Sequence, residues 1–274
     1  MITEFMNYLR NIKGYSENTV NSYGKDLRDF ARWMKSTSST ARWSTITRDD
    51  IDKYLTSQAQ RGLKPATTNR RLSAISGLYG YMRRNGIDID NPCSYECRRK
   101  IAKTVPNTIP AEDIKLAYDH SHGVAKVALG LLATTGIRIQ ELLDIEWHDI
   151  DFQSQAIRVH GKGGKDRVVF TTADKLETLK AVYDMSEPTG YIFSQDQRAM
   201  RYLIFDALRP YSMAKQLSPH AIRHTMATHA ATHGVNVTTL AQTLGHSQLQ
   251  TTQKYIDMTA APVKTVCQQY NIFN

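Results

Sequence analysis

The chain has 274 residues, of which 41% are hydrophobic and 22% charged, and its formal net charge is +9. This balance excludes a disordered protein and indicates one large globular domain or two ordinary ones. No apolar run approaches the roughly 18 residues of a membrane span, and the first residues lack the basic start and apolar core of a secretion signal. We therefore expect a cytoplasmic protein.

The positive charge is concentrated in the first part of the chain. Residues 1–106 hold 19 Lys and Arg against 10 Asp and Glu, whereas residues 107–274 hold 16 of each. A solvated basic face would give the same count. An excess segregated in this way nevertheless favours a polyanionic partner, above all nucleic acid.

The first 88 residues have the pattern of a helical module. Ser16 and Thr19 form a start signal for an apolar stripe, residues 36–45 are a polar break, and a second helix is expected over about 49–60. Pro65 opens a further helix that ends before Gly86. We predict a compact four-helix module, whose first stripe consists of Val20, Tyr23, Leu27, Phe30 and Met34.

Residues 89–110 show no helical or strand period. Asn91-Pro92, Pro106 and Pro110 interrupt the segment, and it carries the basic run Arg98-Arg99-Lys100. We predict a basic linker, which either follows a DNA backbone or is simply solvated. The three cysteines, Cys93, Cys97 and Cys267, are an odd number without paired CxxC units, so we expect free thiols.

Residues 111–274 mix helical and strand patterns. An apolar helix over 124–134 ends at Gly136, and two β-rich runs, 156–160 and 167–172, flank the glycine-rich tip Gly161–Asp166. Further helices are expected at about 174–184, 197–211, 219–233, 237–244 and 251–258. These patterns indicate a mostly helical α+β domain that contains an antiparallel hairpin.

Four short motifs in this second segment contain residues suited to phosphate chemistry. They are Thr135-Gly136-Ile137-Arg138 with Glu141, the hairpin tip with Lys162, His220-Ala221-Ile222-Arg223, and Gly245-His246, which Tyr255 follows after nine residues. Each alone has an ordinary explanation. Arg138 and Glu141 could be an i,i+3 surface ion pair, Lys162 a solvated lysine, and Tyr255 one of 14 tyrosines.

Taken together, the motifs resemble the catalytic signature of the tyrosine recombinase, or phage integrase, family. That signature is an Arg on a TG-x-R turn, a Lys on a β-hairpin, H-x-x-R, a downstream G-H and then a Tyr. The likeness covers nearly the whole chain and is most similar to the Xer-type recombinases. It implies an all-α, SAM-like core-binding bundle over 1–88, the basic linker over 89–110, and a mixed α+β catalytic domain with a C-terminal tail over 111–274.

Two arginines fit the phosphate of this chemistry on physical grounds. A phosphodiester under attack gains negative charge on its non-bridging oxygens, and guanidinium groups match those oxygens geometrically. His220 and Arg223 lie about 60° apart around a helix, so both can address one phosphate. We expect Arg138 and Arg223 to bind the phosphate, and Glu141 to orient the arginines.

The resemblance implies the other roles. Tyr255 is matched to the nucleophile, His220 to the acceptor of its proton, Lys162 to the acid that protonates the leaving 5′ oxygen, and His246 to a hydrogen-bond donor to the phosphate. The product is a 3′-phosphotyrosyl link that a 5′ hydroxyl can reverse. Site-specific integration, excision, inversion or dimer resolution would then need no ATP, cofactor or metal ion.

The expected partner is double-stranded DNA with inverted-repeat core sites, bound by a tetramer. The tail after Tyr255 would dock on a neighbouring subunit, although packing on its own domain fits the sequence equally well; its apolar stripe is Val263, Val266, Tyr270, Ile272 and Phe273. Charge and helical placement predict a DNA surface on the N-terminal module formed by Lys64, Arg70, Arg71, Arg83 and Arg84.

Three other functions compete with this interpretation. His220, His224, His229 and His233 suggest a zinc hydrolase, but the two i,i+4 pairs face opposite sides of a helix and Arg223 would repel a divalent cation. A catalytically inactive DNA-binding or accessory protein would keep the fold without the reaction. A type IB topoisomerase would share the tyrosine chemistry, but the short chain and the Xer-like N-terminal module disfavour it.

Overall fold

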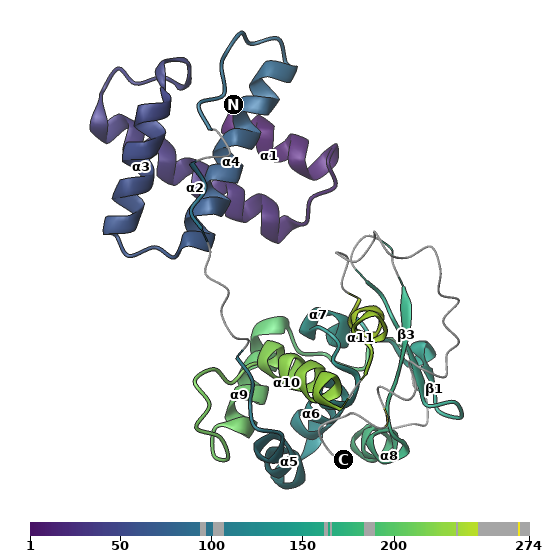
Figure 1. Ribbon diagram of the computed structural model, residues 1–274. Helices are drawn as coiled ribbons and strands as arrows, with labels where there is room; N and C mark the ends of the chain where they lie inside the picture. The colour runs from purple at the N-terminus through teal and green to yellow at the C-terminus, as the bar shows by residue number, and fades with distance from the viewer. Residues whose placement is uncertain are drawn as a thin grey trace. The chain divides into compact units, whose positions relative to one another are not determined.

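The computed structural model describes residues 1–93, 97–100, 107–161, 164, 166–183, 190–233, 235–245 and 268 (Figure 1). The chain divides into two compact units, Met1–Thr104 and Val105–Asn274, each with its own hydrophobic core. Within the described ranges, no helix is both long and apolar enough to cross a membrane.

The regular secondary structure described in the N-terminal unit is helical throughout, which confirms the predicted bundle. Thr47 and Asp50 cap the third helix reciprocally, because each side chain accepts a hydrogen bond from the other residue's backbone N–H. Pro65 occupies the first turn of the fourth, where no N–H is needed. The elements are α1 (Ile2–Asn11), α2 (Glu17–Thr37), the short 3-10 turn η1 (Trp43–Thr45), α3 (Arg48–Gln60) and α4 (Pro65–Arg84).

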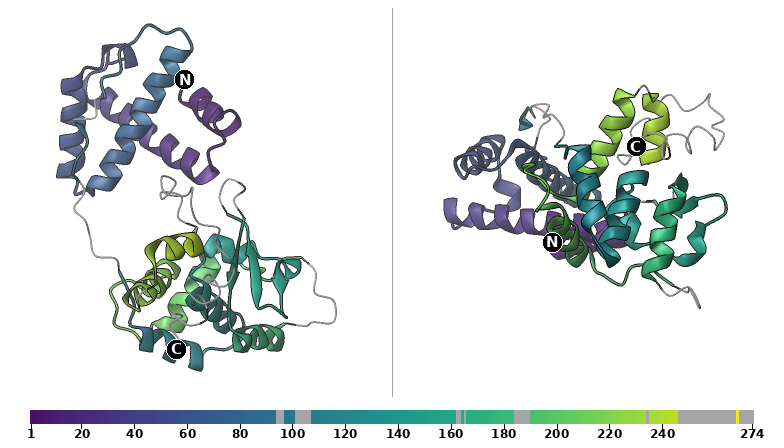
Figure 2. Two further views of the ribbon diagram at one scale, coloured as in Figure 1. Left: turned by 45° about the vertical axis from the view of Figure 1, so that its right-hand side comes forward. Right: turned by 90° about the horizontal axis from the view of Figure 1, so that it is seen from below.

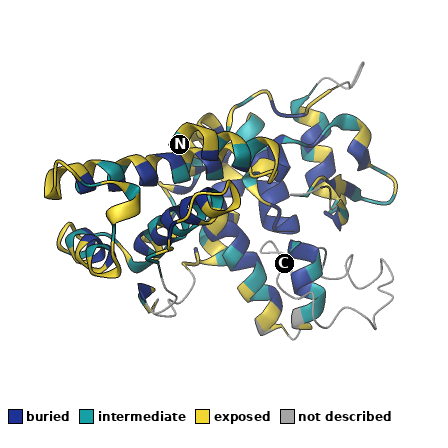
Figure 3. Cartoon of the chain, turned by 90° about the horizontal axis from the view of Figure 1, so that it is seen from above, coloured by how far each residue is buried: buried dark blue, intermediate teal, exposed yellow. Residues whose placement is uncertain are grey.

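Aromatic side chains fill the core of this unit. Phe30 of α2 meets Tyr54 of α3 edge to face at 4.8 Å, and the hydroxyl of Tyr79 in α4 donates to the backbone oxygen of Trp43 (2.7 Å). Each such ring buries a large apolar area and adds a preferred ring geometry. In Figure 3 the helices of the unit are dark blue on their packed faces and yellow outside, the amphipathic division that the sequence period predicts.

The described ends of the predicted linker pack onto the two units. Ile89 and Cys97 are buried in the N-terminal core, and the side chain of Asn69 in α4 holds both the N–H and the oxygen of Arg99 (2.9 and 2.8 Å). At the other end Ile109 is buried in the C-terminal core, where Thr225 bonds its backbone N–H and oxygen. The domain limits 88 and 111 stay predictions.

The C-terminal unit combines helices with a small sheet, as expected. The central helix, α6, is buried on all sides from Val127 to Thr135 and packs against α5, α8, α9 and α10 (Figure 2). The elements are α5 (Ala111–His120), α6 (Gly123–Thr135), α7 (Ile139–Leu143), the 3-10 turn η3 (Trp147–Asp149), β1 (Ile150–Asp151), β2 (Ala156–Val159), β3 (Arg167–Phe170), α8 (Ala173–Val182), α9 (Gln197–Leu208), α10 (Pro219–Thr232) and α11 (Val237–Leu244).

The sheet contains the predicted hairpin. Its strands are antiparallel in the order β1-β2-β3, with Ile150 opposite Ile157 and Val159 opposite Arg167. The connection from β2 to β3 is the glycine-rich segment that carries Lys162, and Lys162 itself lies outside the described residues. The two strands of the hairpin are anchored in the core, because Ile157 and Val169 on the inner face of the sheet are buried there.

Candidate active site

Arg138 is held by the turn that ends α6. Gly136 has φ +63°, and a Cβ there would lie 2.8 Å from the side chain of Leu244, so both the backbone angle and the packing require glycine. Arg138 then precedes α7, and its N–H donates to Glu141 Oε2 (2.8 Å) while its guanidinium donates to Oε1 (2.7 Å). The side chain of Arg138 stays 43% exposed and can therefore reach a ligand.

Arg223 reaches the same place from α10. Ser218 caps this helix by accepting the N–H of Ala221 (3.2 Å), and Pro219 fills the first turn, as the sequence predicts. Arg223 is only 3% exposed and donates to the backbone oxygens of Gly136 and Leu244, both at 2.6 Å. One guanidinium thus fastens the end of α6 to the end of α11.

His220 lies on the same helix as Arg223 and contacts His224. Their Nε2 atoms are 3.1 Å apart, a distance at which one ring donates an N–H to the other. Partial burial, the neighbouring His224, and the guanidiniums of Arg223 and Arg138 all lower the pKa of His220. Its imidazole is therefore mostly neutral at neutral pH and able to accept a proton. The sequence analysis had treated His224 only as a potential zinc ligand.

Arg167 is a member of this group that the sequence analysis missed. It is the first residue of β3, and its guanidinium forms a two-pronged ion pair with Glu141 (3.0 and 2.7 Å). Burial alone would raise the pKa of Glu141, but hydrogen bonds from Arg167 and Arg138 outweigh it and hold that pKa below its ordinary value. Glu141 thus bonds Arg138, as expected, but its other partner is Arg167 rather than Arg223.

The site holds more buried positive than negative charge. Within the described ranges, Glu141 is the one acidic side chain among the guanidiniums gathered here: it pairs with Arg138 and Arg167 and acts on Arg223 through its electrostatic field alone. Burial, together with Arg138 and Arg167, lowers the pKa of Arg223 to about 9 despite the favourable field of Glu141. An anion placed beside these arginines would relieve their repulsion, as phosphate does at arginine clusters.

Three of the predicted catalytic residues, Lys162, His246 and Tyr255, lie outside the described residues. Gly245, which directly precedes His246, caps α11 with φ +63°, and its backbone oxygen accepts a hydrogen bond from Arg138 (3.1 Å). Figure 1 shows α11 beside β3, the strand that follows the Lys162 hairpin. The residue before His246 therefore contacts Arg138 directly, and Arg167, which follows the Lys162 hairpin, is linked to Arg138 through Glu141.

The four histidines of the zinc hypothesis form two separate pairs. His220 contacts His224, and the rings of His229 and His233 lie 4.2 Å apart. In the part of the chain that the structure describes, no group of three or more His, Cys, Asp or Glu side chains is placed to hold a metal ion.

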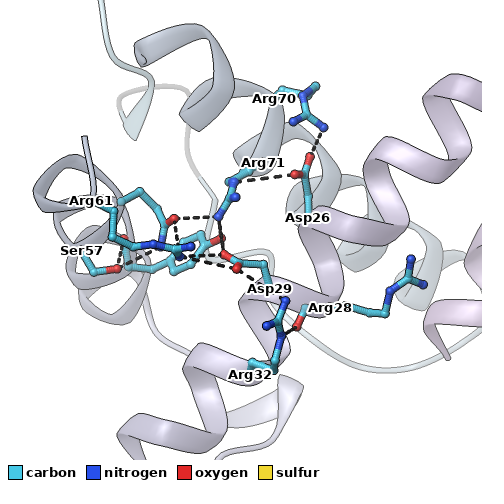
Figure 4. A network of polar contacts seen from close by, with 10 residues as sticks. Asp26, Arg28, Asp29, Arg32, Ser57, Arg61, Arg70 and Arg71 are labelled. Atoms are coloured by element: carbon cyan, nitrogen blue, oxygen red, sulfur yellow. Dashed lines mark hydrogen bonds and ion pairs between the residues drawn. The ribbon is translucent and has the colours of Figure 1, made fainter. Parts of the chain in front are cut away.

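The five basic residues expected on the DNA surface of the N-terminal unit fall into two groups. Lys64, Arg70, Arg83 and Arg84 are exposed, and Arg84 also donates to the hydroxyl of Tyr8 (2.7 Å). Arg71 differs because its side chain is only 13% exposed. It is hydrogen-bonded to Asp29, Tyr54 and Gln58 and ion-paired with Asp26 (Figure 4). These contacts give Arg71 a role inside the bundle, and we leave it out of the DNA surface.

Comparisons with known proteins cover almost the whole chain. The phage integrase family model matches residues 107–261, and the model of the phage integrase N-terminal SAM-like domain matches residues 2–86. Tyrosine recombinase XerC of Listeria welshimeri is 26% identical over 98% of this chain and 96% of its own length, and XerD of Oceanobacillus iheyensis is 27% identical over 98% and 97%.

Solved structures share the fold. The XerH site-specific recombinase in a post-cleavage complex with its palindromic difH substrate superposes with a TM-score of 0.72 at 17% identity, over 92% of this chain and 79% of that one. At this identity the likeness concerns the fold alone.

Proposed function

The chain belongs to the phage integrase family, and on this premise we propose that it is a site-specific tyrosine recombinase that cuts and rejoins DNA through Tyr255. The observation that carries the proposal is the charge at the candidate active site, where Glu141 pairs with Arg138 and Arg167 and the buried Arg223 has no carboxylate bonded to it among the described residues. A site with this surplus of buried positive charge is suited to the scissile phosphate.

The arginines would stabilise the transition state. Attack on the phosphodiester gives a five-coordinate phosphorus with additional negative charge on its non-bridging oxygens. Arg138 is exposed enough to reach those oxygens, and Arg223 has N–H groups beyond the two that bond Gly136 and Leu244. Because both guanidiniums are fixed before DNA binds, little reorganisation is needed at the moment of reaction.

Proton transfer would be shared between two side chains. The Oη of Tyr255 attacks phosphorus while its proton passes to His220, whose lowered pKa keeps the ring ready to accept it. The bond from phosphorus to the 5′ oxygen breaks, and Lys162 protonates that oxygen. His246 would donate a hydrogen bond to a non-bridging oxygen. The family resemblance supports the roles of Lys162, His246 and Tyr255.

The product is a 3′-phosphotyrosyl link and a free 5′ hydroxyl. A 5′ hydroxyl from a second strand can attack this link, reform the phosphodiester and release Tyr255. The energy of the broken bond is kept in the protein–DNA link, so the exchange needs no ATP. We propose that this takes place on DNA in the cytoplasm, at core sites arranged as inverted repeats.

The decisive experiment is covalent capture of nicked DNA that carries the core site. The wild-type chain should form a protein–DNA adduct, whereas Tyr255→Phe should bind the same DNA without forming one. A persistent adduct in Tyr255→Phe would place the nucleophile elsewhere. A wild-type chain that binds but never forms an adduct would be an inactive accessory protein.

A second assay separates recombination from topoisomerase activity. Two core sites on one plasmid should be exchanged, to give deletion or inversion between them. Relaxation of supercoiled DNA that lacks core sites, without exchange between sites, would instead indicate a type IB topoisomerase.

We also propose that the chain acts as a tetramer on DNA, assembled through its C-terminal tail. The described tail residue, Gln268, donates to Gln155 of the same chain (2.6 Å), so residue 268 contacts its own domain. The five residues of the apolar stripe lie outside the described residues. Truncation after Ala261 should abolish DNA-bound tetramers and spare binding to a single site; loss of folding would instead favour a tail packed on its own domain.

A further inference from the structure

Arg167 is more buried and more fully hydrogen-bonded than an arginine in a surface ion pair. It opens β3 opposite Val159, and its side chain is 13% exposed. All three guanidinium nitrogens donate: Nε to the backbone oxygen of Thr243 (2.9 Å), and the two terminal nitrogens to the two oxygens of Glu141 (3.0 and 2.7 Å). This arrangement fits only the planar fork of arginine, because an ammonium group offers a single point of charge.

These contacts join elements that carry separate parts of the proposed chemistry. Glu141, on α7, holds both the backbone and the guanidinium of Arg138. Thr243 is in the last turn of α11, two residues before Gly245, whose oxygen accepts a hydrogen bond from Arg138. Arg167 itself stands five residues after Lys162 in the sequence. One side chain thus links α7, the end of α11 and the strand that leaves the hairpin.

The packing around Arg167 leaves little freedom. A Cβ at Gly245 would lie 2.9 Å from one terminal nitrogen of Arg167 and 3.0 Å from its Cζ, so the guanidinium lies directly against the backbone of the turn before His246. A change in the length or shape of residue 167 must therefore move the carboxylate of Glu141, the turn at Gly245, or both.

A third guanidinium also has an electrostatic cost at this place. Arg167 stands among Arg138 and Arg223, which it repels, and the single carboxylate of Glu141 does not neutralise all three. Buried charges are a weak source of stability, and neutral side chains of similar size often stabilise a fold as well. If position 167 served packing alone, a neutral side chain would suffice there. To fix the orientation of the Glu141 carboxylate, the side chain must bond both carboxylate oxygens, and this requires a guanidinium.

We propose that Arg167 is a positioning residue for DNA strand transfer. It holds Glu141 and the last turn of α11 in fixed relation, so that Arg138 and the residue after Gly245 address the same phosphate. This inference rests on the proposed function. Arg167 acts through Glu141 and the backbone of Thr243, and it exchanges no proton with the DNA.

The first test separates binding from chemistry. Arg167→Gln and Arg167→Lys are compared with Arg158→Gln, which removes a charge from an exposed position on the adjacent strand β2. The readouts are the Kd for the core site and the single-turnover rate of adduct formation at saturating protein. Both Arg167 variants should lose roughly tenfold to hundredfold in rate, less than loss of a direct phosphate donor, with Kd unchanged and Arg158→Gln like wild type.

A double-mutant cycle shows whether Arg167 works through Glu141. Arg167→Gln leaves the buried carboxylate of Glu141 with Arg138 as its one remaining ion-pair partner among the described residues and should lower the thermal midpoint, whereas Arg167→Gln combined with Glu141→Gln removes that buried charge and should recover part of the midpoint. The rate of the double variant should remain as low as that of the slower single variant. Recovery of the rate together with the midpoint would show that Arg167 only stabilises the fold, and would overturn the proposal.

Three further outcomes are distinguishable. If the wild-type chain forms adduct and Arg167→Gln forms it within about twofold of the same rate, the positioning role is wrong and the proposed function stands. If Arg167→Lys restores the full wild-type rate, charge rather than the fork is what matters, and the proposal is equally overturned. If the wild-type chain forms no adduct, it is the proposed function that has failed.

Discussion

The two units each contain a group of arginines held by carboxylates, and the two groups differ in their charge balance. In the N-terminal arginine cluster, Asp26 and Asp29 flank Arg71, the arginine that is mostly buried, while Arg70 remains 41% exposed (Figure 4). In the C-terminal arginine cluster, Arg223 and Arg167 are mostly buried, and the single carboxylate of Glu141 pairs with Arg167 and Arg138 but not with Arg223.

The balance between buried guanidiniums and buried carboxylates separates structural from functional arginines. Among the mostly buried groups, the N-terminal cluster has two carboxylates for one guanidinium, that of Arg71; the exposed Arg32, Arg61 and Arg70 also pair with these carboxylates. The C-terminal cluster has one buried carboxylate for two mostly buried guanidiniums, Arg167 and Arg223, and this buried surplus favours an anion. The balance of buried charge carries this information, whereas the net charge of a region does not: residues 1–106 hold the whole excess and residues 107–274 are neutral in total.

The largest expected effect is on the stability of the N-terminal unit. Arg71→Met would leave the buried Asp26 and the mostly buried Asp29 without their shared partner. Loss of one member of a buried charge pair costs about 3–5 kcal/mol of unfolding free energy, which urea unfolding can measure. Adding Asp26→Asn and Asp29→Asn to this variant should recover part of the loss. A stability of Arg71→Met close to that of wild type would show that the ion pairs of Arg71 with Asp26 and Asp29 do not stabilise the unit.

Arg223→Gln should have the opposite profile. Loss of a preorganised donor in the active site lowers the rate by roughly 10²–10³, or about 2.7–4 kcal/mol of transition-state stabilisation. The unfolding free energy should fall less than in Arg71→Met, because the substitution also removes repulsion from Arg138 and Arg167. Adduct formation and urea unfolding are measured on the same preparations. Equal loss of stability in both variants would remove the distinction between the clusters.

The exposed basic residues of the N-terminal unit should affect DNA binding rather than chemistry, and in the described part of the chain only Arg70 among them also pairs with a buried carboxylate, that of Asp26. Replacing Lys64, Arg70, Arg83 and Arg84 by Ala should weaken DNA binding and reduce the slope of log affinity against log salt by about 0.9 for each phosphate that is no longer neutralised. A charge-matched control replaces four exposed residues of the C-terminal unit, Lys115, Arg198, Arg201 and Arg209. If affinity and slope are unchanged in the first variant, these residues are merely solvated.

The smallest expected effect concerns His160, at the base of the hairpin. Its ring nitrogens lie 3.1 Å from Asp149 and 3.1 Å from Asp166, and only a protonated ring can donate to both. Partial desolvation lowers the pKa of His160, but the two carboxylates outweigh it and raise the pKa above its ordinary value.

The sign of the His160 contribution follows from that shift. The pKa is raised in the folded state, so the contribution to stability is fully present below the unfolded pKa and is lost as the pH rises through the folded one. An NMR titration should give His160 a midpoint above that of an unfolded peptide, and Asp166→Asn should lower it. A His160 midpoint equal to that of an unfolded peptide would contradict the interaction of His160 with Asp149 and Asp166.

Most of the fold could be predicted because its elements have strong periodic signals. The stripe from Val20 to Met34, the cap at Ser218-Pro219 and the glycine at position 136 each mark an element at or near its observed place. No bounds were predicted for α1, and α5, α7 and β1 had no predicted counterpart. Two of these, α7 with five residues and β1 with two, are too short to show a period.

The candidate site was only partly predictable. Arg138, His220 and Arg223 were found from motifs, and the structure brings these three together. Arg167 carried no signal of its own, because a single arginine after a hairpin tip is common and its partners, Glu141 and Thr243, lie 26 and 76 positions away. Arg71 looked like one more basic residue on a helix, although Asp29, 42 positions away, holds it inside the bundle.

The family, the two-part organisation and the order of residues suited to phosphate chemistry could be identified from sequence, because these features depend on residue types at local spacings. Which arginines are neutralised by carboxylates, and which keep a surplus of positive charge, could be identified only from the tertiary structure. That difference depends on burial and on partners distant along the chain, as when Arg223 bonds Gly136 across 87 positions. Free energies of charges depend on their surroundings in three dimensions, and a linear count of charges does not contain them.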